Sequence, residues 1–244
     1  PPVHGAGTPA QPPRRVPPPV SSREFFYESF AAEWDSKMNR DELGKRLRLV
    51  FGSLLAPEEV RGRRVLDAGA GTGHFSRVLD QWGAKLVSLD LGPALLGEVN
   101  KKCRTRPVCG SVLDLPFADG SFDTVLSTEV IEHTPDPRRA VAQLCRVVAP
   151  GGLLVLTVPN RLWRPAILAA TALKLRPYLG HENWVRYRDL GRWLQEEGLA
   201  VDRQCGFNLL PHTVFCRPLF DFLDGWSSLH SCMINIAVRA RKKA

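Results

Sequence analysis

The chain lacks any uninterrupted apolar run of the roughly 20 residues that a helix needs to cross a bilayer. Its most apolar window, from Ala166 to Leu175, already contains Lys174. The N-terminus has no apolar segment typical of a signal peptide, so we expect a cytoplasmic protein. The six cysteines show no Cys-x-x-Cys spacing, which argues against a zinc site and against a disulfide framework.

The chain carries a net charge of +8, but almost none of it lies between its two ends. Residues 1–23 contain three arginines and no acid, and the last six residues contain four basic side chains and no acid. The other 215 residues hold 26 basic and 25 acidic side chains. Because a nucleic-acid groove concentrates positive charge on the folded surface, we expect no nucleic-acid partner.

Length and composition indicate one large globular domain after a short tail. The chain has 244 residues, of which 44% are hydrophobic and 24% charged, enough to form a buried core. Residues 1–20 contain eight prolines and few large apolar side chains, which predicts a flexible tail. A single domain is expected over 21–244. It begins with helices at 21–60, where Phe26, Phe30 and Trp34 have helical spacing and a second helix is predicted from Asp41 to Leu55.

Strand and helix patterns then alternate, which predicts an α/β fold with a doubly wound, mostly parallel sheet. Pro150, Gly151 and Gly152 are expected to end the helix before the fifth strand. The predicted strands are Arg64–Ala68, Lys85–Asp90, Pro107–Ser111, Phe122–Thr128, Gly152–Pro159, Leu199–Arg203 and Met233–Ala240. The predicted helices between them are His74–Trp82, Pro93–Cys103, Pro137–Val148 and Tyr187–Glu197.

A glycine-rich turn after the first predicted strand indicates a ligand site. Gly69, Gly71 and Gly73 alternate with small residues, and glycine lets a ligand approach the backbone without a Cβ in the way. Asp90 ends the second predicted strand, where a carboxylate can accept hydrogen bonds from both hydroxyls of a ribose. The two features together predict a nucleoside-containing ligand.

These residues resemble the S-adenosylmethionine site of class I methyltransferases. The resemblance rests on Asp67–Gly73, on Asp90, and on further similar segments, which are GSVLDLPF at 110–117, SFDTV at 121–125 and LCRVVAPGG at 144–152. It implies a seven-stranded sheet, an adenine contact from Asp114, and contacts from Thr128 beside the methionine portion of the cofactor. Motifs of DNA adenine and cytosine methyltransferases are absent, which favours a small-molecule acceptor.

Within that superfamily the chain is most similar to the ubiquinone-biosynthesis O-methyltransferases. The similarity lies in FAAEWD at 30–35 and in TEVIEHTPDP at 128–137. It implies an arginine near the cofactor carboxylate, for which Arg46 and Arg48 are candidates and Arg48 is preferred. The resemblance also implies a divalent cation such as Mg²⁺ held by Glu129, Glu132 and His133.

The predicted acceptor side comprises His133, His181 and two insertions, at 160–185 and 207–230. Either histidine could act as the base if the acceptor is a hydroxyl. The insertions are apolar with interleaved basic residues, which suits a lid, an acceptor pocket or peripheral contact with a membrane. Two alternatives to O-methylation remain open. They are N- or C-methylation of a sugar, polyketide or peptide product, and a cofactor-binding protein without transferase activity.

Overall fold

The computed structural model describes residues 33, 35, 38–172, 182–209 and 226–244. The predicted tail, most of the first predicted helix, His181 and parts of both insertions lie outside the described residues. The strands are β1 (Arg64–Ala68), β2 (Lys85–Asp90), β3 (Arg106–Cys109), β4 (Phe122–Thr128), β5 (Val148–Pro159), β6 (Leu199–Phe207) and β7 (Asn235–Lys242). The α-helices are α2 (Arg40–Leu49), α3 (His74–Gln81), α4 (Pro93–Lys102), α5 (Pro137–Val147), α6 (Arg164–Ala172) and α7 (Tyr187–Glu196).

Seven strands form one sheet in the order β3-β2-β1-β4-β5-β7-β6. Neighbouring strands from β3 through β5 are parallel, and β7 runs antiparallel to both β5 and β6. The predicted α/β class and mostly parallel sheet are therefore confirmed. Three strands, β1, β2 and β4, have the predicted ends, because turn residues mark both sides of each apolar run.

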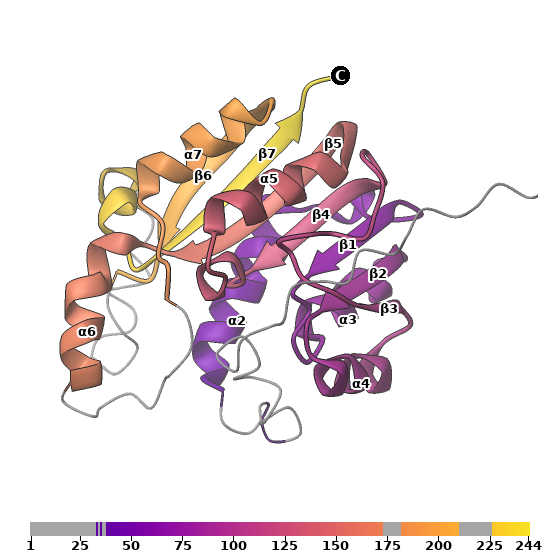
Figure 1. Cartoon of the computed structure of the whole chain (residues 1–244), viewed down its shortest axis with the longest axis horizontal. Helices are drawn as coiled ribbons and strands as arrows, with labels where there is room; N and C mark the ends of the chain where they lie inside the picture. Colours follow the sequence, from indigo (N-terminus) through magenta and orange to yellow (C-terminus); the bar gives the residue numbers. More distant parts are fainter. Residues whose placement is uncertain (1–32, 34, 36–37, 173–181, 210–225) are drawn as a thin grey trace, which may run out of the picture.

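Helices cover both faces of the sheet, with α5 and α7 on one side and α2 and α3 on the other (Figure 1). The first face buries Leu144 of α5 and Leu190 of α7 against the strands. The opposite face buries Phe75 and Leu79 of α3 in one cluster with Leu54. A strand covered on both faces is apolar along its whole length, which explains the run Leu153–Leu156 in β5.

Two predicted helix ends are wrong. The helix expected from Asp41 to Leu55 begins at Arg40 behind an Asn39 cap and changes at Val50 into a π-helical turn that ends at Leu54. Gly151 and Gly152 do not stop a helix, since α5 already ends at Val147 and both glycines lie within β5. A Cβ at Gly152 would lie 2.8 Å from the Asp123 carbonyl oxygen, so close strand packing requires this glycine.

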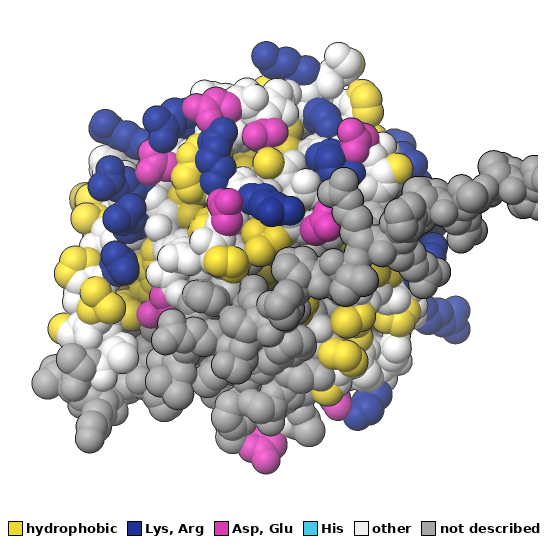
Figure 2. All heavy atoms as spheres, viewed as in Figure 1, with side chains coloured by type: hydrophobic (Ala, Val, Ile, Leu, Met, Phe, Trp, Pro, Cys, Tyr) yellow, Lys and Arg dark blue, Asp and Glu magenta, His cyan; other side chains and the backbone are white. Residues whose placement is uncertain are grey.

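Short helical turns connect several of these elements, and three of them lie next to the ends of β4, β5 and β7. They are η2 (Val50–Leu54), η3 (Pro57–Glu59), η4 (Ile131–His133), η5 (Arg161–Trp163) and η6 (Ser227–Cys232). On the face shown in Figure 2, basic and acidic side chains are interspersed, as the near-neutral body of the sequence predicts. Among the described residues, no helix is both long enough and apolar enough to cross a bilayer.

Candidate functional site

A cavity of about 500 Å³ opens at the carboxyl ends of β1, β2 and β4. The chain runs outward from β1 to β2 and β3, and then returns to β4 on the other side of β1. Such a reversal of strand order leaves a crevice between the two halves of a parallel sheet. Residues of α2 form another wall of this cavity, and η4 and residues 182–184 border it as well.

The glycine turn after β1 forms the floor of the cavity, and two of its glycines have different roles. Gly69 has φ 83°, and a Cβ there would collide with the Val130 side chain, so this position is required for packing. Gly71 has φ 53° and lines the cavity, and a Cβ there would meet nothing within 4 Å. The backbone at Gly71 is therefore open to the cavity, and ligand contact there stays a prediction.

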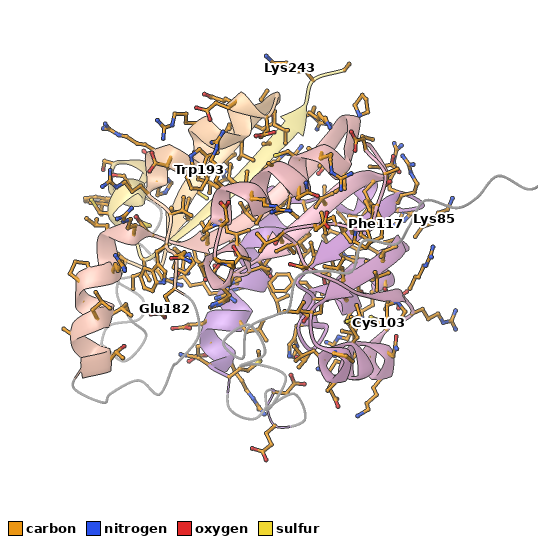
Figure 3. All side chains as sticks on the ribbon, in the orientation of Figure 1. Lys85, Cys103, Phe117, Glu182, Trp193 and Lys243 are labelled. Atoms are coloured by element: carbon orange, nitrogen blue, oxygen red, sulfur yellow. The ribbon has the colours of Figure 1, made fainter. Side chains whose placement is uncertain are left out.

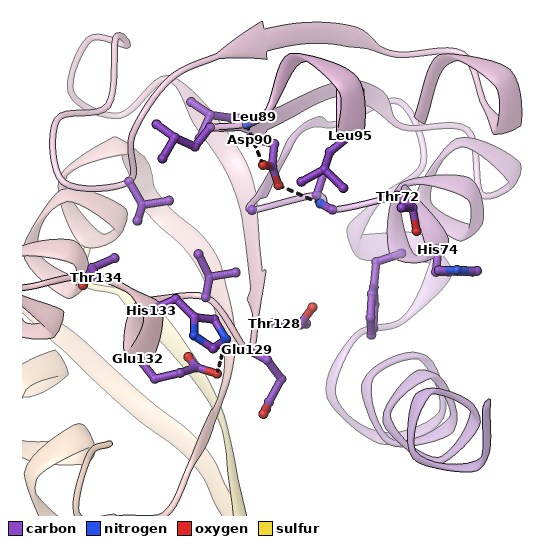
Figure 4. Close-up of a pocket in the computed structure, with 18 of the residues that line it drawn as sticks. Thr72, His74, Leu89, Asp90, Leu95, Thr128, Glu129, Glu132, His133 and Thr134 are labelled. Atoms are coloured by element: carbon purple, nitrogen blue, oxygen red, sulfur yellow. Dashed lines mark hydrogen bonds and ion pairs between the residues drawn. The ribbon is translucent and has the colours of Figure 1, made fainter. Parts of the chain in front are cut away.

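Asp90 is held at the cavity by two backbone groups. Its Oδ2 accepts a hydrogen bond from the Gly71 N–H at 2.8 Å, and its Oδ1 accepts one from the Gly92 N–H at 3.0 Å (Figure 4). The carboxylate thus joins the end of β2 to the glycine turn. Its position in the cavity wall agrees with the predicted role as an acceptor for ribose hydroxyls.

Asp67 and Gly73 lie outside the cavity wall, contrary to the expectation of direct ligand contact. Asp67 is 1% exposed, and its Oδ2 accepts a hydrogen bond from Ser76 Oγ at 2.6 Å. Burial raises the pKa of this carboxyl to about 7, against the lowering effect of the Ser76 bond. Gly73 precedes α3 in a left-handed conformation and packs against Val99 of α4. Both residues therefore hold the glycine turn in place through internal contacts and do not face the cavity.

The Asp114 side chain does not lie where the resemblance implies. Its side chain is exposed and does not line the cavity, whereas Gly110, Ser111 and Val112 from the same loop do. The loop turns back at this point, because the Asp114 N–H donates to the Ser111 carbonyl oxygen at 3.2 Å. This loop therefore reaches the cavity at Gly110, Ser111 and Val112 and not at Asp114.

Arg46 lines the cavity, whereas the preferred candidate Arg48 does not and is exposed. Two residues apart on an α-helix differ by about 200° in direction, so only one of this pair can face the sheet. The Arg46 Nη2 lies 3.8 Å from Glu129 Oε2. Sequence distance from the glycine turn could not distinguish the two arginines, since it says nothing of which helix face is inward.

The Asp35 carboxylate, from the segment before α2, also holds the glycine turn through hydrogen bonds. Asp35 Oδ1 accepts hydrogen bonds from Thr72 Oγ1 at 2.7 Å and from His74 Nε2 at 2.9 Å, and Lys102 Nζ bonds its other oxygen. Lys102 also donates to the Thr72 carbonyl oxygen at 2.7 Å. Burial raises the pKa of Asp35, but the bonds from Lys102, Thr72 and His74 outweigh it and lower the pKa to about 2. Asp35 ends the FAAEWD segment of the resemblance, but no sequence pattern indicated these contacts.

Two acidic side chains after β4, the largely buried Glu129 and the 1% exposed Glu132, line the cavity. Burial raises the pKa of both carboxyls. The charge of Arg46 opposes the rise at Glu129, and repulsion from Glu129 adds to the rise at Glu132. Within the described part of the chain, Glu129 Oε1, Glu132 Oε2 and Arg46 Nε are buried without a hydrogen-bond partner.

The metal site expected at Glu129, Glu132 and His133 is not supported. In the described ranges, no three His, Cys, Asp or Glu side chains are grouped as metal ligands. Glu129 Oε2 instead accepts a hydrogen bond from Asn235 Nδ2 at 2.9 Å and faces the cationic Arg46. His133 Nε2 lies 3.7 Å from Glu132 Oε1, so these two side chains pair with each other (Figure 4).

Thr128 and His133 line the cavity, and their predicted contacts with cofactor and acceptor stay predictions, whereas His181 lies outside the described residues. Glu182 and the 9% exposed Trp184 also border the cavity and were not foreseen individually. In Figure 3, Glu182 and Cys103 lie on opposite sides of α2, toward α6 and α4 respectively. We call the part of the cavity bordered by η4 and residues 182–184 the acceptor end, and the part at the glycine turn and Asp90 the cofactor end.

The chain is similar in sequence to known methyltransferases. Residues 38–204 match the model of the family described as "Methyltransferase domain". A ubiquinone biosynthesis O-methyltransferase from Methylococcus capsulatus is 29% identical over 202 residues, covering 77% of this chain and 84% of the relative. Another from Xanthomonas euvesicatoria is 32% identical over 162 residues, covering 61% of this chain and 67% of the relative.

Solved structures share the fold at low sequence identity. Magnesium protoporphyrin IX methyltransferase from Synechocystis, solved with bound S-adenosylhomocysteine, has a TM-score of 0.65 and 18% identity, and the match covers 91% of this chain and 98% of that one. An S-adenosylmethionine-dependent methyltransferase from Mesorhizobium loti has a TM-score of 0.59 and 20% identity, with coverage of 75% and 93%. Both similarities support the seven-stranded arrangement.

Proposed function

The chain belongs to the methyltransferase domain family and is an S-adenosylmethionine-dependent methyltransferase, and from this premise we propose that it methylates a hydroxyl oxygen of a small molecule. Relatives named as ubiquinone biosynthesis O-methyltransferases support transfer to oxygen. The observation that carries the proposal is one cavity of about 500 Å³ that contains both the cofactor end and an imidazole, that of His133. That volume suits a small-molecule acceptor.

The residues at the cofactor end fit S-adenosylmethionine. Gly71 leaves room for a ligand against the backbone, and Asp90 is fixed where it can accept hydrogen bonds from ribose hydroxyls. Arg46 has a buried Nε without a partner among the described residues, which suits the carboxylate of the amino-acid portion. When bound, S-adenosylmethionine supplies a methyl group on a positively charged sulfur.

The chain contributes chiefly by orienting groups and excluding water. With the cofactor bound, the walls of the cavity would hold the acceptor and orient its oxygen toward the methyl group. His133 takes the hydroxyl proton, and Glu132 Oε1 borders this imidazole at 3.7 Å from Nε2. Thr128, at the end of β4, lines the cavity between the cofactor end and the acceptor end.

A screen of acceptors tests the proposal. The protein is incubated with S-adenosylmethionine and matched phenols, sugars and amines, and methylated products are identified by mass spectrometry. We expect products from hydroxyl acceptors, and loss of turnover in His133→Ala that shrinks at high pH, where the acceptor hydroxyl ionises without a base. Products only from amines or carbon acids would support the alternative of N- or C-methylation. Tight S-adenosylhomocysteine binding without any product would indicate a cofactor-binding protein.

We also propose a weak peripheral contact between a membrane and the insertion after β5. Leu162 of η5 and Leu168 of α6 are 59% and 53% exposed, and Arg161 and Arg164 flank them. Exposed apolar side chains with adjacent arginines suit an anionic lipid surface. Cosedimentation with anionic vesicles should fall when Leu162 and Leu168 are both replaced by glutamate. Equal cosedimentation of wild type with anionic and neutral vesicles, or none with either, would contradict this contact.

A further inference from the structure

The proposed base His133 lies at the end of a very short helical turn. η4 (Ile131–His133) is a single 3₁₀ turn, in which the His133 N–H donates to the Val130 carbonyl oxygen at 3.0 Å. The turn begins just after Glu129, whose φ of 54° lies in the left-handed region. A single turn after a strained residue has little stability of its own, so its position depends on contacts from neighbouring segments.

Asn183 contacts this turn on both sides of His133. Its backbone N–H donates to the Glu132 carbonyl oxygen at 2.8 Å, and its side-chain Nδ2 donates to the Thr134 carbonyl oxygen at 2.7 Å. The last carbonyl groups of a helical turn have no partner within the turn, so they need donors from elsewhere. Figure 4 shows Glu132, His133 and Thr134 in this order along the chain. One residue therefore bonds the two residues that flank the imidazole.

The segment that carries Asn183 is itself fixed to the end of the sheet. Val185 is 2% exposed and forms a parallel bridge with Asn160, directly after β5. The Val185 carbonyl oxygen accepts a hydrogen bond from the Arg161 N–H at 2.9 Å. Asn160 is also 2% exposed, and its Nδ2 donates to the Met233 carbonyl oxygen at 3.0 Å. The donors of Asn183 therefore lie two residues from a buried anchor, as a positioning contact requires.

Asn183 also lies between two residues that line the cavity. Glu182 and Trp184 border the acceptor end, and the Trp184 side chain is 9% exposed. The Asn183 amide bonds η4, while its neighbours on either side form part of the cavity wall. The same segment therefore fixes both this wall and the backbone around His133.

We propose that Asn183 is a positioning residue, which holds the His133 imidazole in the orientation that proton removal from the acceptor requires. The proposal rests on the proposed function, because it takes His133 as the base. Asn183 acts only through the backbone on both sides of His133. A misplacement of about 1 Å can lower a rate on the order of 100-fold. Because other segments form the cofactor end, loss of the Asn183 amide should lower turnover and leave cofactor affinity unchanged.

Nuclear magnetic resonance of the histidine rings tests this orientation without any acceptor. Isotope-labelled protein saturated with S-adenosylhomocysteine is compared as wild type, Asn183→Ala and the control Asn100→Ala, at an exposed residue of α4. The His133 ring signal, assigned by its loss in His133→Ala, should shift or broaden in Asn183→Ala, because the imidazole then adopts several orientations. In Asn100→Ala it should match wild type.

The ring of His74, at the cofactor end of the cavity, is the internal reference for this measurement. Its signal should be the same in wild type, Asn183→Ala and Asn100→Ala. An unchanged His133 signal in Asn183→Ala would overturn the proposal. A His74 signal that moves as much as that of His133 would also contradict it, because the change would then be general.

A double-mutant cycle separates positioning from a merely structural role. With an acceptor identified by the screen, Asn183→Ala should lower kcat about 10-fold or more and keep the affinity for S-adenosylhomocysteine within about twofold of wild type. In the His133→Ala background the same substitution should change kcat less than about twofold, because the group that it positions is gone. Equal losses in the two backgrounds would mean that Asn183 does not act through His133.

A second variant tests the proposal if the alanine variant does not fold. Asn183→Asp keeps the backbone N–H and nearly the same volume, but its ionised carboxylate cannot donate to the Thr134 carbonyl oxygen. It should move the His133 signal and lower kcat, and wild-type behaviour in both measurements would count against the proposal. If His133→Ala turned over like wild type, the proposed base would be wrong, whereas the ring signals would still decide whether Asn183 orients His133.

Discussion

The two ends of the cavity are built from different kinds of structure. The cofactor end consists mainly of backbone, namely the glycine turn after β1 and the N–H groups that hold Asp90 at 2.8 and 3.0 Å. The acceptor end consists of side chains such as Glu132, His133 and Trp184, which come from separate segments. A backbone site depends on strand order and glycine positions. A side-chain site depends on how distant elements pack, so it can change its ligand without changing the fold.

The largest expected effect tests the cofactor end. Asp90→Ala removes the carboxylate proposed to bind both ribose hydroxyls, and each charge-assisted hydrogen bond contributes about 1.5–3 kcal/mol. We expect the affinity for S-adenosylhomocysteine to fall about 100-fold or more in titration calorimetry. Asp114→Ala is the matched control, because that exposed carboxylate lies outside the cavity wall and should leave affinity unchanged. The reverse result would restore the sequence-based assignment of Asp114.

Two substitutions in one turn distinguish packing from ligand binding. In Gly69→Ala the new Cβ collides with Val130, and the positive φ adds strain, so we expect unfolding free energy to fall by about 2–3 kcal/mol. Gly71→Ala has positive φ but open space, so it should cost about 1 kcal/mol of stability and chiefly weaken cofactor binding. Chemical denaturation and calorimetry measure the two effects. Equal stability losses would mean that Gly69 has no special packing role.

The choice between two arginines tests the α2 wall. Arg46→Gln should weaken S-adenosylhomocysteine binding about tenfold or more, since a charged hydrogen bond to the ligand carboxylate contributes roughly 1.5–3 kcal/mol. Arg48→Gln makes the same chemical change on an exposed face of the same helix and should bind like wild type. If instead Arg48→Gln alone lost affinity, α2 would have to rotate when the cofactor binds.

A further effect, spread over several pH units, concerns Asp67. Its folded-state pKa of about 7 lies above the roughly 3.9 of an unfolded aspartate, so the folded protein holds this proton more tightly. The resulting contribution to stability is complete below about pH 4 and is lost as pH rises toward 7, by at most about 1.4 kcal/mol per pH unit. Asp67→Asn lacks this loss, so its stability relative to wild type should increase over that range.

Urea denaturation of the cofactor-free protein between pH 5 and 8 measures the effect of Asp67→Asn. Asp119→Asn, at a side chain that is 80% exposed, serves as the control and should show a constant difference from wild type. A constant difference for Asp67→Asn as well would mean that Asp67 is ionised in the folded protein throughout.

Much of the cofactor end could be predicted because local signals coincide there. Apolar runs bounded by turn residues gave the ends of β1, β2 and β4, and the glycine spacing with Asp90 indicated the ligand. The errors at this end arose where local spacing does not fix direction. Arg46 and Arg48 differ only in helix face, and Asp114 follows a turn whose reversal depends on the Ser111 carbonyl oxygen.

The sequence by itself determined the fold class, the strand that carries the glycine turn and the acidic residue that follows it, because hydrophobic periodicity and glycine act over a few neighbouring residues. Only the tertiary structure decided which arginine faces inward, that Asp67 supports the turn from beneath, and that Asn235 holds Glu129 from 106 residues away. Such contacts arise from packing of α2, β4 and β7 against one another. No local pattern encodes them, since each side chain finds its partner only after the sheet has assembled.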